Sequence, residues 1–124
     1  MNIGFIVKGV SWMEGKKVMV TGGAGFIGYH LCKRLSELNS NLTIYDNLSS
    51  GTMQNVSDIP KANFVKGDIL DLKTLCEVPK QDLIYHLAAQ VVVGYSMENP
   101  LADFDTNAKG TLHVLEKARR DDAR

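Results

Sequence analysis

Short apolar runs alternate with stretches of helical periodicity along most of this chain. The first run, Val18-Met19-Val20, is β-branched in part and apolar on both faces, which is typical of a strand buried in a parallel sheet. Similar reasoning predicts further strands at residues 42–45, 63–66 and 82–87. The segments between them are long enough to hold helical crossovers.

Three helices are predicted between and after these strands. The first covers residues 26–38, where apolar side chains recur at helical spacing, and Asn39-Ser40-Asn41 ends it. The second is short, over residues 73–77, with Asp71 as its N-cap and Pro79 after its end. The third is long and opens at Pro100. Its apolar stripe consists of Leu101, Phe104, Ala108, Leu112, Leu115 and Ala118.

Strands that alternate with helices predict an α/β fold with a parallel sheet and right-handed connections. The expected strand order is 3-2-1-4, with the ligand crevice between strands 1 and 4. Residues 47–62 are polar and are expected to form a long loop with one helical turn near 53–56. Residues 88–99 are expected to form a second loop.

Composition narrows the possibilities without naming a function. The 124 residues suffice for one small domain. Fourteen basic side chains balance fourteen acidic ones, so no general attraction to nucleic acid or anionic lipid is expected. A basic cluster near the end of the chain is interpreted as a solvated helix terminus rather than a binding patch.

The two cysteines, Cys32 and Cys76, do not have the spacing of metal ligands, and no metal site is expected. They are interpreted as small buried apolar residues on helices of a protein in a reducing compartment, the cytoplasm. No apolar run approaches the roughly 18 residues that span a bilayer.

The first twelve residues are interpreted as an N-terminal extension, because the pattern of a domain start, Met13-Glu14-Gly15-Lys16-Lys17, follows them. A mis-assigned start codon would explain them, and the alternatives are an additional strand at residues 3–7 or a flexible arm. They have no basic leader, so a signal peptide is not expected. The domain proper is expected to cover residues 13–124.

The strongest chemical signal is the G-x-x-G-x-x-G pattern of residues 22–28, placed directly between a strand and a helix. Gly22 allows the sharp turn off the strand, Gly25 lets a pyrophosphate approach the backbone, and Gly28 allows helix and sheet to pack closely. The helix then begins with free N–H groups and a partial positive charge, which suit an anion. This combination predicts a Rossmann-type fold that binds a dinucleotide.

An acidic residue ends the second strand, where such folds hold the adenosine ribose. Asp46 lies 18 residues beyond Gly28, and its carboxylate can accept two hydrogen bonds from ribose hydroxyls. A 2′-phosphate there would face like charge, so NAD is favoured over NADP. Asp68 follows strand 3, where it either meets the adenine edge or serves as a turn residue. The small residues after strand 4 either admit the cofactor or pack under a loop.

Together these residues resemble the extended short-chain dehydrogenase/reductase family, in the NAD-dependent epimerase/dehydratase branch that acts on nucleotide sugars. The matching stretches are TGGAGFIG (21–28), YDNLSSG (45–51), GDILD (67–71), HLAAQ (86–90), ENP (98–100) and NAKGTLHVLEKAR (107–119). The resemblance implies a UDP-hexose 4-epimerase, with a 4,6-dehydratase or a UDP-glucuronate decarboxylase as alternatives. It also implies that the helix from Pro100 to Arg119 pairs with its counterpart in a homodimer.

The resemblance assigns each cofactor contact to residues of this chain. Those implied to hold the pyrophosphate are Gly22, Gly25, Phe26, Ile27 and Gly28. Those implied to lie at the adenosine ribose are Asp46, Asn47, Ser50 and Gly51, and those at adenine are Asp68 and Ile69. Those implied to line the nicotinamide half are Leu87, Ala88, Ala89 and Gln90, with Asn107 near the cofactor.

The family's catalytic Tyr-x-x-x-Lys pair lies on a later helix, and the resemblance implies that this chain ends before it and before the substrate lobe. No catalytic residue is therefore predicted here. The pair Tyr29 and Lys33 has the same spacing but lies directly after the glycine loop, so it is not interpreted as catalytic.

Three hypotheses remain open at this stage. The chain is the NAD-binding part of a nucleotide-sugar epimerase, completed by a C-terminal chain if the gene is split. It is a catalytically inert NAD-binding module. It is a non-functional remnant of a truncated gene. A downstream reading frame with Tyr-x-x-x-Lys would favour the first.

Overall fold

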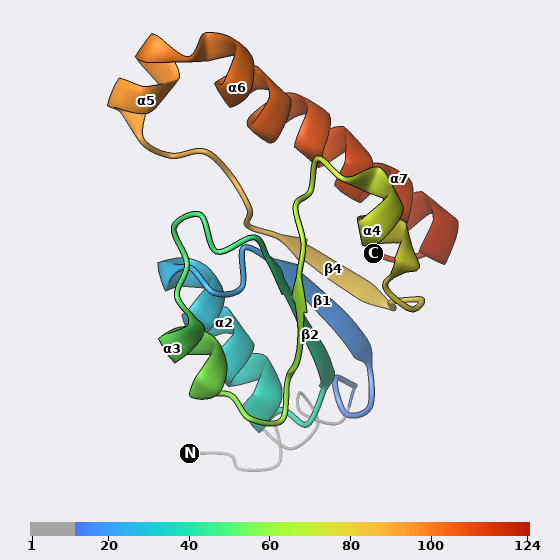
Figure 1. The fold of residues 1–124 in the computed structure, drawn as a ribbon. Coiled ribbons are helices and arrows are strands. Elements are labelled where there is room, and N and C mark those ends of the chain that lie inside the picture. The colour runs from blue at the N-terminus through green and yellow to red at the C-terminus, as the bar shows by residue number, and fades with distance from the viewer. Residues whose placement is uncertain (1–11) are drawn as a thin grey trace, which may run out of the picture.

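The computed structural model describes residues 12–124, and they form a twisted parallel sheet between two helical layers (Figure 1). The sheet contains four strands in the order β3-β2-β1-β4, and all three neighbouring pairs are parallel. This arrangement confirms the predicted α/β fold and its strand order. The strands are β1 (Lys17–Thr21), β2 (Asn41–Asp46), β3 (Asn63–Lys66) and β4 (Leu83–His86).

The helices confirm most of the sequence-based expectations. The first three are α2 (Phe26–Glu37), α3 (Met53–Ser57) and α4 (Leu72–Glu77). Asp71 caps α4 as predicted, because its side chain accepts a hydrogen bond from the N–H of Thr74. The remaining helical elements are α5 (Val93–Glu98), α6 (Pro100–Phe104), the π-helix η1 (Asp105–Lys109) and α7 (Gly110–Asp121).

Alternation along the strands divides the core between the two faces of the sheet. Val18 and Val20 of β1 pack in one cluster with residues of α2 and α3, whereas Met19 packs in another with residues of α4 and α7. This follows from the period of two along a strand, which sends successive side chains to opposite faces. Figure 1 shows α2 and α3 on one side of the sheet and α4 and α7 on the other.

Two predictions beyond strand 4 need correction. The segment 88–99, predicted as a loop, contains the helix α5. This helix ends at Glu98, because Asn99 precedes a proline and is sterically disfavoured in the α conformation. The long helix predicted from Pro100 is not uniform, since it passes through the π-helical turn η1 between α6 and α7. Hydrophobic periodicity does not report such a turn, because the stripe continues on both sides of it.

The outer edge of β4 is partly paired by the last residue of the chain. The N–H of Ile84 donates to the carbonyl of Arg124 (2.8 Å), and the N–H of Arg124 donates to the carbonyl of Asp82 (3.1 Å). All four residues of β4 are only half-buried.

The extension predicted at residues 1–12 and the alternative strand at residues 3–7 fall almost wholly outside the described residues. Within the described part of the chain, no helix combines the length and the apolar character that crossing a membrane requires.

Candidate functional site

The carboxyl ends of the four strands surround a cavity of about 710 Å³. Parallel α/β sheets bind ligands at this edge, where the turns after the strands converge. The turn after β1 forms one wall, the ends of β2 and β3 form the adjacent wall, and the segment after β4 closes the other side.

Fourteen of the sixteen residues predicted for the cofactor site line this cavity. They are Gly22, Gly25, Phe26, Ile27, Gly28, Asp46, Asn47, Ser50, Asp68, Ile69, Leu87, Ala88, Ala89 and Gln90. The other two, Gly51 and Asn107, support the walls instead. A Cβ at Gly51 would lie 2.8 Å from the backbone of Ala24, so this glycine lets the loop after β2 lie against the glycine turn.

Sequence reasoning missed seven lining residues, namely Tyr45, Ser49, Gly67, Val91, Val92, Tyr95 and Thr106. Tyr45, Ser49 and Gly67 adjoin residues that were predicted, and their positions at strand ends were the available signal. Val91, Val92 and Tyr95 belong to the segment around α5, which was predicted as a loop and therefore gave no facing direction for its side chains.

The glycine turn has the backbone geometry that its sequence predicts. Gly22 adopts a left-handed φ of +69°, and a Cβ there would lie 2.7 Å from the backbone N of Ala88. A Cβ at Gly28 would collide with the carbonyl of Gly22, so the close approach of α2 to the turn requires glycine. At Gly25 a Cβ would meet only the carbonyl of Gly22, at 3.4 Å.

The start of α2 offers hydrogen-bond donors to the cavity. Gly25 is the N-cap residue, and no side chain caps the helix. The first N–H groups of a helix have no intrahelical acceptor, and they lie at the positive end of the helix dipole. Phe26 and Ile27 are 80% and 69% exposed, and both line the cavity. This end of α2 is therefore suited to an anionic group.

Asp46 is buried, with 7% of its surface exposed, and it ties two walls of the cavity together. Its Oδ2 accepts a hydrogen bond from the N–H of Ala24 (3.0 Å), and its Oδ1 accepts one from the N–H of Leu48 (2.7 Å). Each carboxylate oxygen has a second lone pair, so Asp46 retains the capacity to accept from a ligand.

The thiol of Cys32 lies beneath this turn and is not a reactive group. Burial, reinforced by the negative charge of Asp46, raises the pKa of the Cys32 thiol to about 12. The thiol is therefore protonated at neutral pH. This agrees with the interpretation of Cys32 as a small buried residue of the core. Cys76 differs from that interpretation, because it is only partly buried and lines the groove between α4 and α7.

The ends of β2 and β3 are held together by polar contacts at the cavity rim. Asn47 donates from Nδ2 to Oδ2 of Asp68 (3.2 Å), and Oδ1 of Asp68 accepts from the N–H of Leu70 (2.8 Å). Below them, the Tyr45 hydroxyl donates to the carbonyl of Asp68 (3.0 Å). Burial, with the charges of Asp71 and Asp68, raises the Tyr45 pKa to about 12. Tyr45 is therefore a neutral donor that fixes the position of Asp68.

Asn107 fastens the opposite wall to the π-helical turn. Its Oδ1 accepts from the N–H of Gln90 (2.8 Å), and its Nδ2 donates to the carbonyl of the same residue (3.1 Å). The Gln90 side chain in turn accepts from the N–H groups of Val91 and Val92. The side-chain amide of Asn107 thus forms hydrogen bonds with both the N–H and the carbonyl of Gln90.

The pair Tyr29 and Lys33 lies outside the cavity, on the face of α2 that meets α3. The Tyr29 hydroxyl donates to Asp58, and Nζ of Lys33 is 3.7 Å from Oδ2 of the same carboxylate. The pair links α2 to the end of α3.

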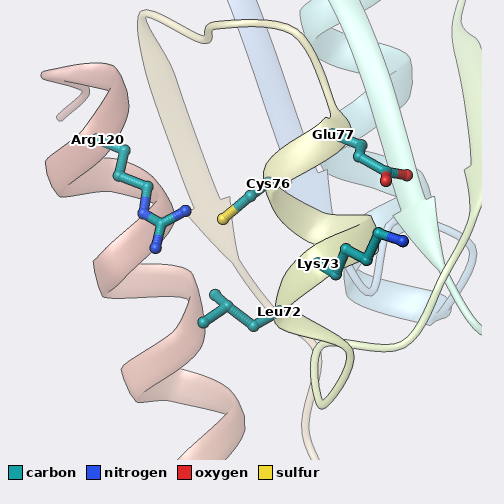
Figure 2. A pocket seen from close by; sticks show the side chains of 5 residues that line it. All are labelled: Leu72, Lys73, Cys76, Glu77 and Arg120. Carbon is teal, nitrogen blue, oxygen red and sulfur yellow. The ribbon is translucent and has the colours of Figure 1, made fainter.

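A smaller cavity of about 440 Å³ lies between α4 and α7 (Figure 2). Its lining residues are Leu72, Lys73, Cys76, Glu77 and Arg120. None of them belongs to the larger cavity or was predicted as a site residue. The cavity is a shallow groove on the flank of the sheet, away from the strand ends.

Comparisons with known proteins match this arrangement to one family. The family model described as GDP-mannose 4,6 dehydratase matches residues 19–124. The UDP-glucose 4-epimerase of Rhizobium meliloti is 39% identical over 109 residues, which cover 86% of this chain and 32% of that protein. The chain therefore spans about a third of the length of the curated relatives that it matches.

Solved structures agree with the sequence relatives. An epimerase from Methanothermobacter thermautotrophicus superposes with a TM-score of 0.91 and 38% identity, over 99% of this chain and 37% of that one. A UDP-glucose-4-epimerase from Stenotrophomonas maltophila, solved with bound NAD and formylated UDP-arabinopyranose, gives a TM-score of 0.82. It is 31% identical, and the match covers 88% of this chain and 35% of that one.

Proposed function

This chain belongs to the NAD-dependent epimerase/dehydratase branch of the extended short-chain dehydrogenases/reductases, and we propose that its cavity at the strand ends binds NAD. The observation that carries the proposal is the left-handed glycine turn that leads into the uncapped start of α2, with the carboxylate of Asp46 hydrogen-bonded to the same turn. N–H groups with a positive dipole suit the pyrophosphate, and a carboxylate suits the ribose hydroxyls.

The cofactor's parts are assigned along the cavity from one end to the other. Gly22, Gly25 and the backbone N–H groups of residues 26–28 hold the pyrophosphate. Asp46 and Asn47 hold the adenosine ribose, with Ser50 and Gly51 beside it, and Asp68 with Ile69 flanks adenine. Residues 87–90 line the nicotinamide half, and Asn107 fixes that wall through Gln90.

Asp46 also favours NAD over NADP. A 2′-phosphate would bring negative charge against a buried carboxylate, and no lysine or arginine lines the cavity among the described residues. Two of the carboxylate's lone pairs already serve backbone N–H groups, so it does not move aside without loss of those contacts.

For the whole protein, we propose nucleotide-sugar chemistry, with UDP-hexose 4-epimerization as the first candidate. Relatives named as UDP-glucose 4-epimerases support it. NAD, when bound, supplies a hydride acceptor and donor to such a reaction. The alternatives are a nucleotide-sugar 4,6-dehydratase, which the family model's description supports, and a UDP-glucuronate decarboxylase.

A second candidate function is a catalytically inert NAD-binding fragment. Tyr29 and Lys33 form the one Tyr-x-x-x-Lys pair in the given sequence, and they lie on the far face of α2, outside the cavity. A C-terminal polypeptide that restores nucleotide-sugar turnover when mixed with this chain would exclude the inert fragment.

We further propose a homodimer through α6 and α7. We also propose a cytoplasmic location, to which the free thiols of Cys32 and Cys76 are suited.

Calorimetric titration of NAD into the purified chain tests the proposal. We expect saturable binding and an affinity about 10- to 150-fold weaker in Asp46→Ala, the effect of losing hydrogen bonds to a charged group. Glu37→Ala, which removes an exposed carboxylate at the far end of α2, is the matched control and should bind like wild type. Absence of NAD binding by the folded wild-type chain would contradict the proposal.

A further inference from the structure

His86, the last residue of β4, connects three elements but does not line the cavity. Its Nδ1 lies 2.7 Å from the hydroxyl of Thr21 at the end of β1, and its Nε2 lies 3.0 Å from the hydroxyl of Thr111 in α7. The imidazole is partly buried. Both of its ring nitrogens therefore meet neutral hydroxyl groups from neighbouring elements.

The neighbouring contacts determine the direction of every hydrogen bond in this group. The Thr111 hydroxyl donates to the carbonyl of Asn107 (2.6 Å), so it accepts from the Nε2–H of His86. Nδ1 then carries no proton and accepts from the hydroxyl of Thr21. These bonds form one chain, which we call the His86 relay: Thr21 to His86 to Thr111 to the Asn107 carbonyl.

The Thr21 end of the relay holds the wall of the cavity. Because the Thr21 hydroxyl gives its proton to His86, its lone pairs are directed to other donors. It accepts from the backbone N–H groups of Leu87 (3.2 Å) and Ala88 (3.3 Å), and both residues line the cavity. The same stretch of backbone presses against Gly22, where a Cβ would lie 2.7 Å from the N of Ala88.

The other end of the relay is Asn107, which holds the far end of the same wall at Gln90. The carbonyl that accepts from Thr111 belongs to Asn107 in the π-helical turn. The side chain of Asn107 binds the backbone of Gln90 by two hydrogen bonds. The segment 87–90 is thus fastened at both ends by residues that the relay joins.

We propose that His86, as the neutral Nε2–H tautomer, is a positioning residue that sets the backbone of Leu87 and Ala88 against the glycine turn for NAD binding. This inference rests on the proposed function and deepens it, because it names a residue outside the cavity that shapes it. The alternative is a partly buried histidine whose hydrogen bonds are merely satisfied.

The environment of the ring favours its neutral form. Burial lowers the pKa of His86 below its ordinary value, because the imidazolium form would lose hydration. Protonation would place a donor on Nδ1, against the oxygen of Thr21, and the Thr21 hydroxyl proton would then lose its acceptor.

Two measurements on the full chain test the proposal. The ¹⁵N shifts of the imidazole report its tautomer, and we expect Nε2–H at neutral pH in the wild type. In His86→Leu and in the gentler Thr111→Val, NAD affinity should fall about fivefold to tenfold, the loss of one well-formed hydrogen bond. In the absence of NAD, the amide hydrogen of Ala88 should also exchange faster in both variants than in the wild type.

The variants distinguish a relay from simple packing. His86→Asn retains an acceptor near the position of Nδ1 but loses the donor to Thr111, so its NAD affinity should match that of Thr111→Val rather than that of the wild type. The double variant His86→Leu/Thr111→Val should lose less than the sum of the two single effects, because both changes break one relay. Thr74→Val, at the cap of α4, is the control and should bind NAD like wild type.

The outcomes separate this inference from the proposed function. If the wild-type chain folds but does not bind NAD, both fail. If the wild type binds NAD, and if both Thr111→Val and His86→Leu bind NAD with the affinity of the wild type, the positioning role alone fails. An Nδ1–H tautomer or an imidazolium at neutral pH would also overturn the relay.

Discussion

Single side chains around the cavity are constrained by backbone geometry more than by side-chain chemistry. Gly22 must adopt a left-handed conformation while the backbone of Ala88 approaches it closely. The two carboxylate oxygens of Asp46 each accept a hydrogen bond, from the N–H groups of Ala24 and Leu48. The residues that we assign to the ligand therefore also build the walls that hold it.

Replacement of Gly22 by alanine should destabilise the fold. The left-handed backbone and the collision with Ala88 each carry a cost, and we expect a loss of about 2–4 kcal/mol in the free energy of unfolding. Denaturant unfolding followed by circular dichroism measures it. Gly94→Ala is the matched control, because a Cβ at Gly94 in α5 meets nothing within 4 Å. A Gly22→Ala protein as stable as Gly94→Ala would contradict this account of the turn.

His86 should make stability dependent on pH. Burial lowers its pKa in the folded protein below the ordinary value of 6.5, so acid protonates the unfolded chain first and favours unfolding. The contribution of the neutral ring is complete above about pH 6.5 and is lost as the pH falls through the folded pKa. The difference in unfolding free energy between wild type and His86→Gln should therefore shrink on acidification. A difference that stays constant between about pH 7.5 and pH 5 would contradict the prediction.

Among the secondary-structure elements, α7 is anchored by a buried ion pair. Lys117 has 2% of its surface exposed, and its Nζ donates to the carbonyl of Val78 (2.6 Å) and lies 2.8 Å from Oδ2 of Asp121. Asp121 also accepts from the N–H of Gln81 (2.9 Å). These contacts fix the end of α7 to the connection between α4 and β4.

Removal of the buried ammonium should be costly. In Lys117→Met, the carboxylate of Asp121 is left buried without its partner, and we expect a loss of about 3–5 kcal/mol in the free energy of unfolding. Thermal and denaturant unfolding measure it. The control is Arg119→Ala, which breaks an exposed pair with Glu116 on the same helix and should leave stability close to wild type. Equal stability of the two variants would show that the buried pair does not anchor α7.

The elements differ in how well sequence predicts them. β1 and α2 are found from periodicity and from the glycine pattern between them, because burial on both faces and tight packing demand particular residue types. α5 is missed, since all but one of its residues are exposed and no side chain caps it, so no apolar stripe marks it. The π-turn η1 is also missed, because the contact of Asn107 in this turn with Gln90 is a tertiary contact that periodicity does not report.

The site shows the same division. Fourteen of the cavity-lining residues, Asp46 among them, follow from motifs at strand ends, which the topology brings together. The His86 relay and the contribution of Val91, Val92 and Tyr95 could not be predicted, because they depend on the relative placement of β1, α5 and α7.

Across the whole molecule, the sheet is covered less completely at its edge strands than at its central strands. β4 is half-buried throughout, whereas β1 and β2 are almost fully buried. Beyond β4, the long helical segment carries exposed apolar side chains on one stripe. They are Leu101, Phe104, Leu112 and Leu115. Exposed apolar stripes of this kind mark interfaces more often than free surface.

If this stripe forms the proposed homodimer, charge placed on it should separate the subunits. We expect Phe104→Glu/Leu112→Glu to elute as a monomer in size-exclusion chromatography with light scattering, at concentrations where the wild type is a dimer. The fold should persist, because both side chains are more than half exposed. Lys109→Glu is the control, because Lys109 is an exposed residue between Phe104 and Leu112 in the sequence and is not one of the apolar residues of the stripe. A wild type that remains monomeric at high concentration would contradict the homodimer.

The central claim is that the cavity at the strand ends, rather than the groove between α4 and α7, binds NAD. Mapping of amide chemical shifts in the ¹⁵N-labelled chain during titration with NAD tests it most directly. We predict that the largest shifts occur at residues 25–28, at Asp46 and Asn47, and at residues 87–90, while Leu72–Glu77 is unchanged. Shifts confined to Leu72–Glu77, or no shifts in a folded chain at saturating NAD, would contradict the claim.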